Sequence, residues 1–161
     1  MININASDLV GLYDAMYEIE KLKDDIMEIS ARLKKLQNEE LNNIIRKIDE
    51  LISVTYWFAA AHTKIIEVHY ILFKEGKRVN VEKTLVSKDS LNGEPERFNT
   101  NLEDNISKIE MYIGANKNVI DEKYEKEIKN YIALLRKFGE VFARFIAELT
   151  KDLDLVYYAF K

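Results

Sequence analysis

The chain has 161 residues, 47 % of them apolar and 32 % charged, which suits one globular domain with its own hydrophobic core and excludes a disordered chain. It contains no cysteine, which excludes disulfide frameworks, thiol catalysis and Cys-ligated zinc, and its five glycines and one proline are too few for a turn-rich β-sandwich. A formal net charge of -4 argues against a dedicated nucleic-acid-binding protein.

The first predicted helix covers residues 7–37 and has the clearest heptad pattern. Two apolar rows repeat every seven residues, as the a and d positions of a coiled-coil-like helix do. Ser7 and Asp8 provide a predicted N-cap and a favourable charge in the first turn. The rows predict packing against another helix, either within one bundle or between chains. They contain Leu12, Ala15, Ile19, Leu22, Ile26, Ile29, Leu33 and Leu36.

A second helix is predicted over residues 39–74, after a tight turn. The apolar frame slips by one residue at "QNEEL", where Asn38 is a predicted N-cap and two glutamates follow it in the first turn. The stretch "VTYWFAAA", residues 54–61, carries no charge on any side. We expect it to be covered all round, by its own bundle or by another chain, and Trp57 within it is a candidate interface residue.

A long loop is predicted over residues 75–101, because the helical period fails there and Gly76, Gly93 and Pro95 interrupt it. Within the loop "RVNV" alternates like a strand, and a hairpin with "YILF" is an alternative. The loop region also holds a local excess of positive charge, which is either a phosphate-contacting patch or an ordinary solvated loop. This candidate basic loop comprises Lys74, Lys77, Arg78, Lys83 and Lys88.

The third predicted helix covers residues 102–113, with a capping box formed by Thr100 and Glu103 and with Gly114 as its C-cap. The last predicted helix covers residues 118–159. Its apolar face comprises Ile128, Tyr131, Leu135, Phe138, Phe142, Phe145, Leu149 and Val156.

The apolar end of this last helix is a second candidate interface. A helix of about 40 residues would outrun a partner of twelve, and the excess stays apolar in "LVYYAF". The alternative is that the first two helices cover it within one chain. The candidate residues are Leu155, Val156, Tyr157, Tyr158 and Phe160.

His62 and His69 are the only histidines, and their spacing does not suit a metal site. They lie seven residues apart, whereas two ligands on one helix need a spacing of three or four. Ala59 and Ile66 occupy the positions where a di-iron bundle would carry glutamate. We therefore expect two polar residues at the edge of the core, hydrogen-bonded to Tyr or Thr of a neighbouring helix. Asp152 is expected to mark the point where the last helix leaves the core.

These patterns predict an all-α fold: a single domain, residues 1–161, forming an antiparallel bundle of about four long, coiled-coil-like helices with one long inter-helix loop. No run of ~18 apolar residues predicts a membrane span, and "MININASDLV" lacks the features of a signal peptide, so a cytoplasmic location is expected. No catalytic, cofactor-binding or metal-binding residue is predicted.

Three functions are consistent with the sequence. The first is a non-enzymatic protein that acts by protein–protein association, as a homo-oligomer or docked on a partner. The second is a small helical subunit, coat or inhibitor protein of a nucleoprotein assembly, of the CRISPR or viral kind, which would bind nucleic acid through the basic loop. The third is an enzyme with a composite site near His62 and His69.

Overall fold

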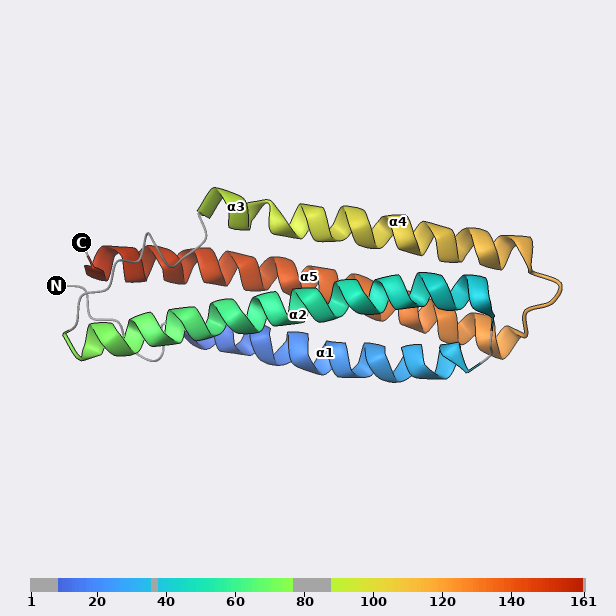
Figure 1. Cartoon of the computed structure of the whole chain (residues 1–161), viewed down its shortest axis with the longest axis horizontal. Helices are drawn as coiled ribbons and strands as arrows, with labels where there is room; N and C mark the ends of the chain where they lie inside the picture. Colours follow the sequence, from blue (N-terminus) through green and yellow to red (C-terminus); the bar gives the residue numbers. More distant parts are fainter. Residues whose placement is uncertain (1–8, 36–37, 77–87, 161) are drawn as a thin grey trace.

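The computed structural model describes residues 9–35, 38–76 and 88–160, except for the side chains of Phe73, Leu155 and residues 157–160, and these ranges form an elongated helical bundle (Figure 1). The long helices run alternately up and down, and the described ranges contain no strand, which confirms the predicted all-α antiparallel bundle. The elements are α1 (Val10–Lys34), α2 (Glu39–Lys74), α3 (Lys88–Asn92), α4 (Glu94–Ala115) and α5 (Glu122–Phe160).

The hydrophobic core follows the predicted heptad rows. All described members of the α1 rows are buried, and so are the eight residues predicted for the apolar face of α5. Helix α5 packs against each of the other four helices, and α2 packs against α1, α4 and α5. Apolar rows at heptad spacing therefore place α5 at the centre of the bundle and fix the inward faces of its neighbours.

The turn between α1 and α2 is closed by asparagine side chains. The backbone N–H of Leu41 donates to Asn38 Oδ1 at 3.0 Å, which confirms Asn38 as the N-cap of α2. Asn42 Nδ2 donates to the carbonyl of Lys34 at 3.2 Å, across the turn. Asn38 Nδ2 also donates to the Tyr112 hydroxyl, so the same residue joins the turn to α4. The tight hairpin predicted from the slipped frame is therefore confirmed.

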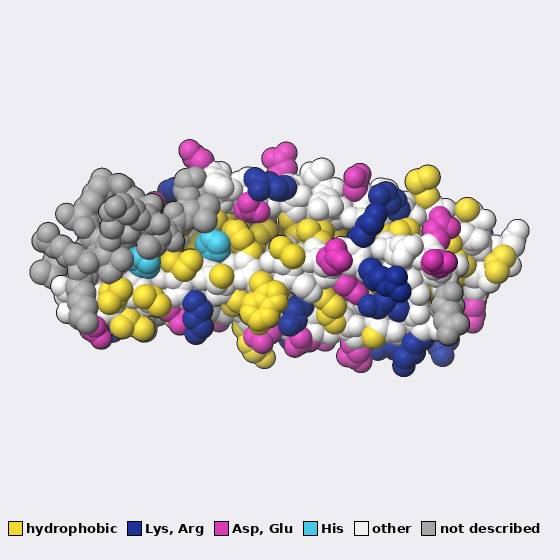
Figure 2. Space-filling model, in the orientation of Figure 1, with side chains coloured by type: hydrophobic (Ala, Val, Ile, Leu, Met, Phe, Trp, Pro, Cys, Tyr) yellow, Lys and Arg dark blue, Asp and Glu magenta, His cyan; other side chains and the backbone are white. Residues whose placement is uncertain are grey.

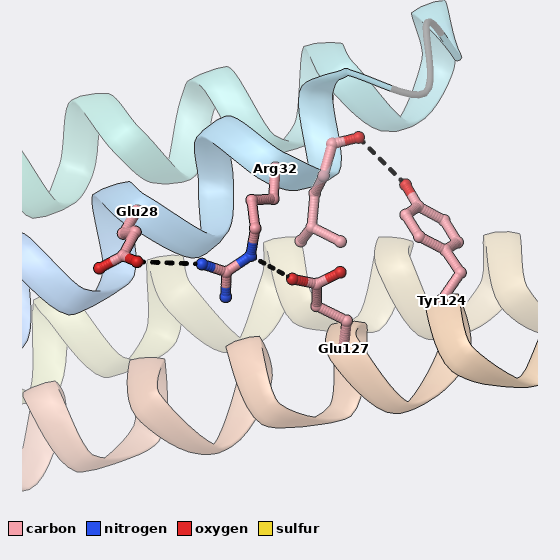
Figure 3. A network of polar contacts seen from close by, with 5 residues as sticks. Glu28, Arg32, Tyr124 and Glu127 are labelled. Atoms are coloured by element: carbon pink, nitrogen blue, oxygen red, sulfur yellow. Dashed lines mark hydrogen bonds and ion pairs between the residues drawn. The ribbon is translucent and has the colours of Figure 1, made fainter.

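A polar network ties the end of α1 to the start of α5 (Figure 3). Arg32 Nε donates to Glu127 Oε1 at 2.5 Å, and Arg32 Nη1 donates to Glu28 Oε1 at 3.2 Å within α1. The Tyr124 hydroxyl donates to the carbonyl of Leu33 at 3.3 Å, and burial raises the pKa of Tyr124 to about 12. These contacts pin the turn end of α1 on α5.

The predicted loop 75–101 is wrong for residues 88–101, which are helical apart from Gly93. Gly93 is the N-cap of α4 and Pro95 lies in its first turn, where a missing N–H costs no hydrogen bond. The predicted capping box is therefore wrong, because Thr100 lies inside α4. Gly114 is also helical, and the C-cap is Asn116. "YILF" belongs to α2, so the hairpin alternative is wrong too, and "RVNV" lies outside the described residues.

Two other helix starts differ from the prediction. Helix α1 begins at Val10 with Leu9 as its N-cap, and Ser7 and Asp8 lie outside the described residues. Helix α5 begins at Glu122, after the predicted Asn118, and the N–H of Lys123 donates to Asp121 Oδ1 at 3.1 Å. Asp121 therefore acts as the N-cap of α5, because its short polar side chain accepts a hydrogen bond from the first turn of the helix.

Candidate functional site

The outer face of α2 carries a second apolar row, which we call the outer seam: Val54, Trp57, Ala61, Lys64, Val68 and Ile71. Its members follow one another at alternating steps of three and four, as a and d positions do, and only Lys64 is polar. All six are exposed; Trp57 has 68 % and Val54 67 % of its surface accessible. Its own bundle therefore does not cover residues 54–61 all round, and the other alternative, cover by another chain, stays a prediction.

The outer seam is exposed because the neighbouring helices occupy the other sides of α2. Its inner row, from Ile45 through Ile52 and Ala59 to Ile66, is fully buried. On one flank Lys23 of α1 lies 4.1 Å from the centre of the Tyr56 ring. On the other, the rings of Phe58 and Phe142 of α5 meet edge-on with centres 6.1 Å apart. The space-filling view shows hydrophobic side chains along the front of α2 (Figure 2).

Helix α1 also carries exposed apolar groups. Val10, Tyr13 and Tyr17 are spaced at three and four residues and all are exposed. Burial, and then the charge of nearby Glu67 on α2, raises the pKa of Tyr13. Of these three residues, Tyr13 is the one that comes close to Glu67 of α2.

The two histidines are buried, as predicted, and are coloured cyan in Figure 2. His62 Nδ1 donates to the carbonyl of Phe58 at 2.8 Å, and His69 Nδ1 donates to the carbonyl of Ile65 at 2.7 Å. For His62 the predicted partner, a Tyr or Thr of a neighbouring helix, is thus replaced by a carbonyl four residues back in its own helix. The His62 ring also lies on Phe58, with centres 4.1 Å apart.

The described residues contain no cluster of three or more His, Asp or Glu side chains that could hold a metal ion. In the same ranges, no helix has the length and apolar character that a membrane crossing requires. Asp152 has an exposed fraction of 0 %, and Leu153 and Val156 beyond it are also buried. The prediction that Asp152 marks the point where α5 leaves the core is therefore wrong. Its negative charge contributes to the raised pKa of Tyr13.

The second candidate interface, at the end of α5, is described only in part by the structure. Val156 is 1 % exposed, so it belongs to the core of the single chain, and the side chains of Leu155, Tyr157, Tyr158 and Phe160 lie outside the described residues. The length argument for this interface fails as well. Helix α4 has 22 residues where twelve were expected, and α3 adds a further contact to α5.

The candidate basic loop lies mostly outside the described ranges, which include only two of its five residues. Lys88 Nζ lies 2.6 Å from Asp154 Oδ2 of α5, and Lys74 Nζ lies 5.1 Å from the centre of the Tyr70 ring. Lys77, Arg78 and Lys83 are not described. The structure therefore does not bring the five basic residues together as one described surface.

A shallow groove of about 370 Å³ runs between α4 and α5. Ile113, Ile132 and Ala133 line it, with Arg136 at its edge. Arg136 Nε donates to Glu103 Oε1 at 3.0 Å, so its charge is already partnered by α4. Lys129, the other cation in the lining, lies 3.6 Å from Glu125 Oε1, so both cations of this groove have acidic partners.

Sequence reasoning missed two features. The outer seam recurs with the same seven-residue period as the inner row, so a search of every heptad position along α2 would have found it. The second missed feature is a set of hydrogen bonds that joins α1 to Asp49 of α2. Ser30 Oγ donates to Asp49 Oδ2 at 2.7 Å and Lys34 Nζ donates to the same oxygen at 2.8 Å. Nothing in the periodicity pairs these residues, which lie on different helices.

In comparisons with protein families, with curated proteins and with solved structures, no family, protein or structure matches this chain.

Proposed function

We propose that the protein is non-enzymatic and acts by association, packing an apolar-faced α-helix of another polypeptide along its outer seam. The single observation that carries this proposal is the exposed heptad row of α2, with a tryptophan in it. A row of this kind on the outside of a folded bundle is a surface to which a second helix can fit by knobs-into-holes packing. Tryptophan is also among the residue types that contribute most often to the energetic centre of a protein interface.

The detailed make-up of the outer seam favours a helical partner. Ala61, near its centre, is small and allows a second helix to approach closely. Lys64 forms an ion pair with Glu67 at 3.2 Å, so its charge can stay at the rim while its methylene chain covers apolar surface. Since both flanks of α2 are already packed against α1 and α5, the partner would lie along the seam itself.

Site-specific photo-crosslinking in cells that express the chain tests this proposal. A photoreactive residue at position 57 or 68 should give a discrete crosslinked product. The same residue at Met111, which is 74 % exposed on α4 and away from the seam, is the matched control. A second control adds Trp57→Ser to the chain labelled at position 68, and should remove the product. Equal labelling from positions 57 and 111, or none from 57 and 68, would contradict the proposal.

The other two hypotheses gain no support from the described residues. Lys88 is engaged in an ion pair, and both histidines are buried against the backbone of their own helix. A nucleoprotein role and a composite catalytic site therefore stay hypotheses. Binding of nucleic acid that weakens steeply with salt would favour the first of them.

A further inference from the structure

We infer that the helix packed on the outer seam is α2 of a second copy of this chain, running antiparallel about a two-fold axis between Ala61 and Lys64. This inference rests on the proposed function, because it names the partner of the same surface. A two-fold contact requires one surface to be complementary to itself. The order of residues along the outer seam meets this requirement.

The antiparallel alignment pairs large residues with aliphatic ones. If Ala61 lies opposite Lys64 of the second copy, Trp57 lies opposite Val68 and Val54 lies opposite Ile71. The Trp57 ring thus meets a β-branched aliphatic side chain, and the small Ala61 leaves space for the long Lys64. Complementary pairs of this kind pack without a void or a clash.

Within the outer seam the charges favour the same alignment, and the contact ends one step beyond the seam, where Glu50 falls opposite Glu75 of the second copy. Opposite Ala61, Lys64 can keep its ion pair with Glu67 of its own chain. Glu67 flanks the seam and falls near Ala60 of the second copy, so neither charged side chain meets a like charge. A parallel, in-register pair would instead place Lys64 on Lys64 and Trp57 on Trp57. Like charges directly opposite are destabilising, which disfavours the parallel, in-register arrangement.

The flank of the seam adds apolar contact to this arrangement. Phe58 and Ile65 are only half-buried in the single chain, and the antiparallel alignment brings each near the other in the second copy. The seam spans about 26 Å, since 17 residues separate its ends and each rises about 1.5 Å. A standard interface buries about 800 Å² per partner, so a contact of under five helical turns predicts a dimer that dissociates on dilution.

Cysteine crosslinking tests the inference directly, because the natural chain has no cysteine to interfere. Purified Val54→Cys and Ile71→Cys chains are oxidised separately and as a mixture. The mixture should give a disulfide-linked dimer, because positions 54 and 71 face each other. Either chain alone should give none above background, because its two cysteines lie about 26 Å apart and a disulfide needs Cα atoms within about 7 Å. Met111→Cys, exposed on α4, sets the background from random collisions.

Light scattering at increasing concentration supplies a second readout. The parent chain should approach twice its monomer mass, and Trp57→Ser should weaken self-association about 30-fold.

A dimer from Val54→Cys alone would overturn the antiparallel arrangement. A monomer throughout, with no crosslinking in the mixture, would overturn the second copy as the partner. In that case, a photo-crosslinked product of another mass in cells would leave the proposed function standing, and no product would overturn both.

Discussion

The inner row and the outer seam of α2 are two stripes of one helix with opposite environments. Ile45, Ile52 and Ile66 have no exposed surface, whereas Val54 and Trp57 are about two-thirds exposed. Both stripes are apolar and both recur at heptad spacing. The inner row is covered because α1, α4 and α5 lie against it, and the outer seam is left uncovered between two packed flanks. An apolar heptad row therefore predicts that a helix packs there, but not which polypeptide provides it.

Truncating the inner row is expected to have the largest effect. Ile52→Ala removes buried methyl groups and leaves a cavity, so it should lower the free energy of unfolding by about 2–5 kcal/mol. Val54→Ala, two residues away on the outer seam, should change it by only about 0.5 kcal/mol in dilute solution. Urea unfolding followed by circular dichroism measures both. Similar losses in the two variants would show that the two stripes are not distinct.

His62→Ala is expected to cost less, about 2 kcal/mol. The change removes a buried ring that lies on Phe58 and leaves a cavity at the edge of the core. It also removes a hydrogen bond to a backbone carbonyl, whose net contribution is about 1 kcal/mol. His62→Phe is the matched control, because it restores the ring without the hydrogen bond and should recover most of the stability. A His62→Ala variant that melts like the parent would place this side chain outside the core.

A charge at the centre of the outer seam should separate association from folding. Ala61 is exposed, so Ala61→Lys and Ala61→Glu should both fold like the parent. In the antiparallel pair, position 61 faces Lys64 of the second copy. Lysine there meets a like charge and glutamate an opposite one, so the lysine variant should self-associate roughly tenfold more weakly than the glutamate variant. Sedimentation equilibrium at low salt measures the ratio. The reverse order would contradict the proposed pairing.

Alkaline pH is expected to lower stability only in a narrow range, above about pH 10. Burial, and then the charge of Asp49, raises the pKa of Tyr131, and burial raises that of Tyr124 to about 12. Both hydroxyls stay neutral in the folded chain when unfolded tyrosines, with pKa near ~10, ionise. The unfolded state then binds fewer protons, so the free energy of unfolding is unchanged below about pH 10 and falls as pH rises above it.

The urea midpoint between pH 7 and 11.5 measures this loss. The double variant Tyr124→Phe/Tyr131→Phe should lose less stability above pH 10 than the parent. If it loses as much, ionisation of other groups causes the alkaline unfolding.

Helix α2 shows how far the sequence alone reaches. Its bounds, residues 39–74, agree with the prediction, because Asn38 and the two glutamates after it are strong local signals for a helix start. The buried rows of α1 and α5 were also predictable, since a repeated apolar face has to be covered. The start of α4 was missed because Gly93 and Pro95 were interpreted as loop residues. Glycine and proline also occur at helix N-termini, and the local sequence does not distinguish a loop from a helix start here.

The sequence by itself determined that the protein is all-helical and which rows of α1 and α5 line its core, because helix starts and apolar periodicity act over a few turns of one chain segment. Only the tertiary structure decided which apolar stripe of α2 stays uncovered, because that depends on where α1 and α5 lie around it. Tertiary packing also enclosed Asp152 and brought Ser30 and Lys34 to Asp49. Close approach likewise explains Gly139, where a Cβ would lie 2.6 Å from Asn99 Oδ1 of α4. These contacts join residues on different helices, and no pattern within one helix specifies which helix will face it.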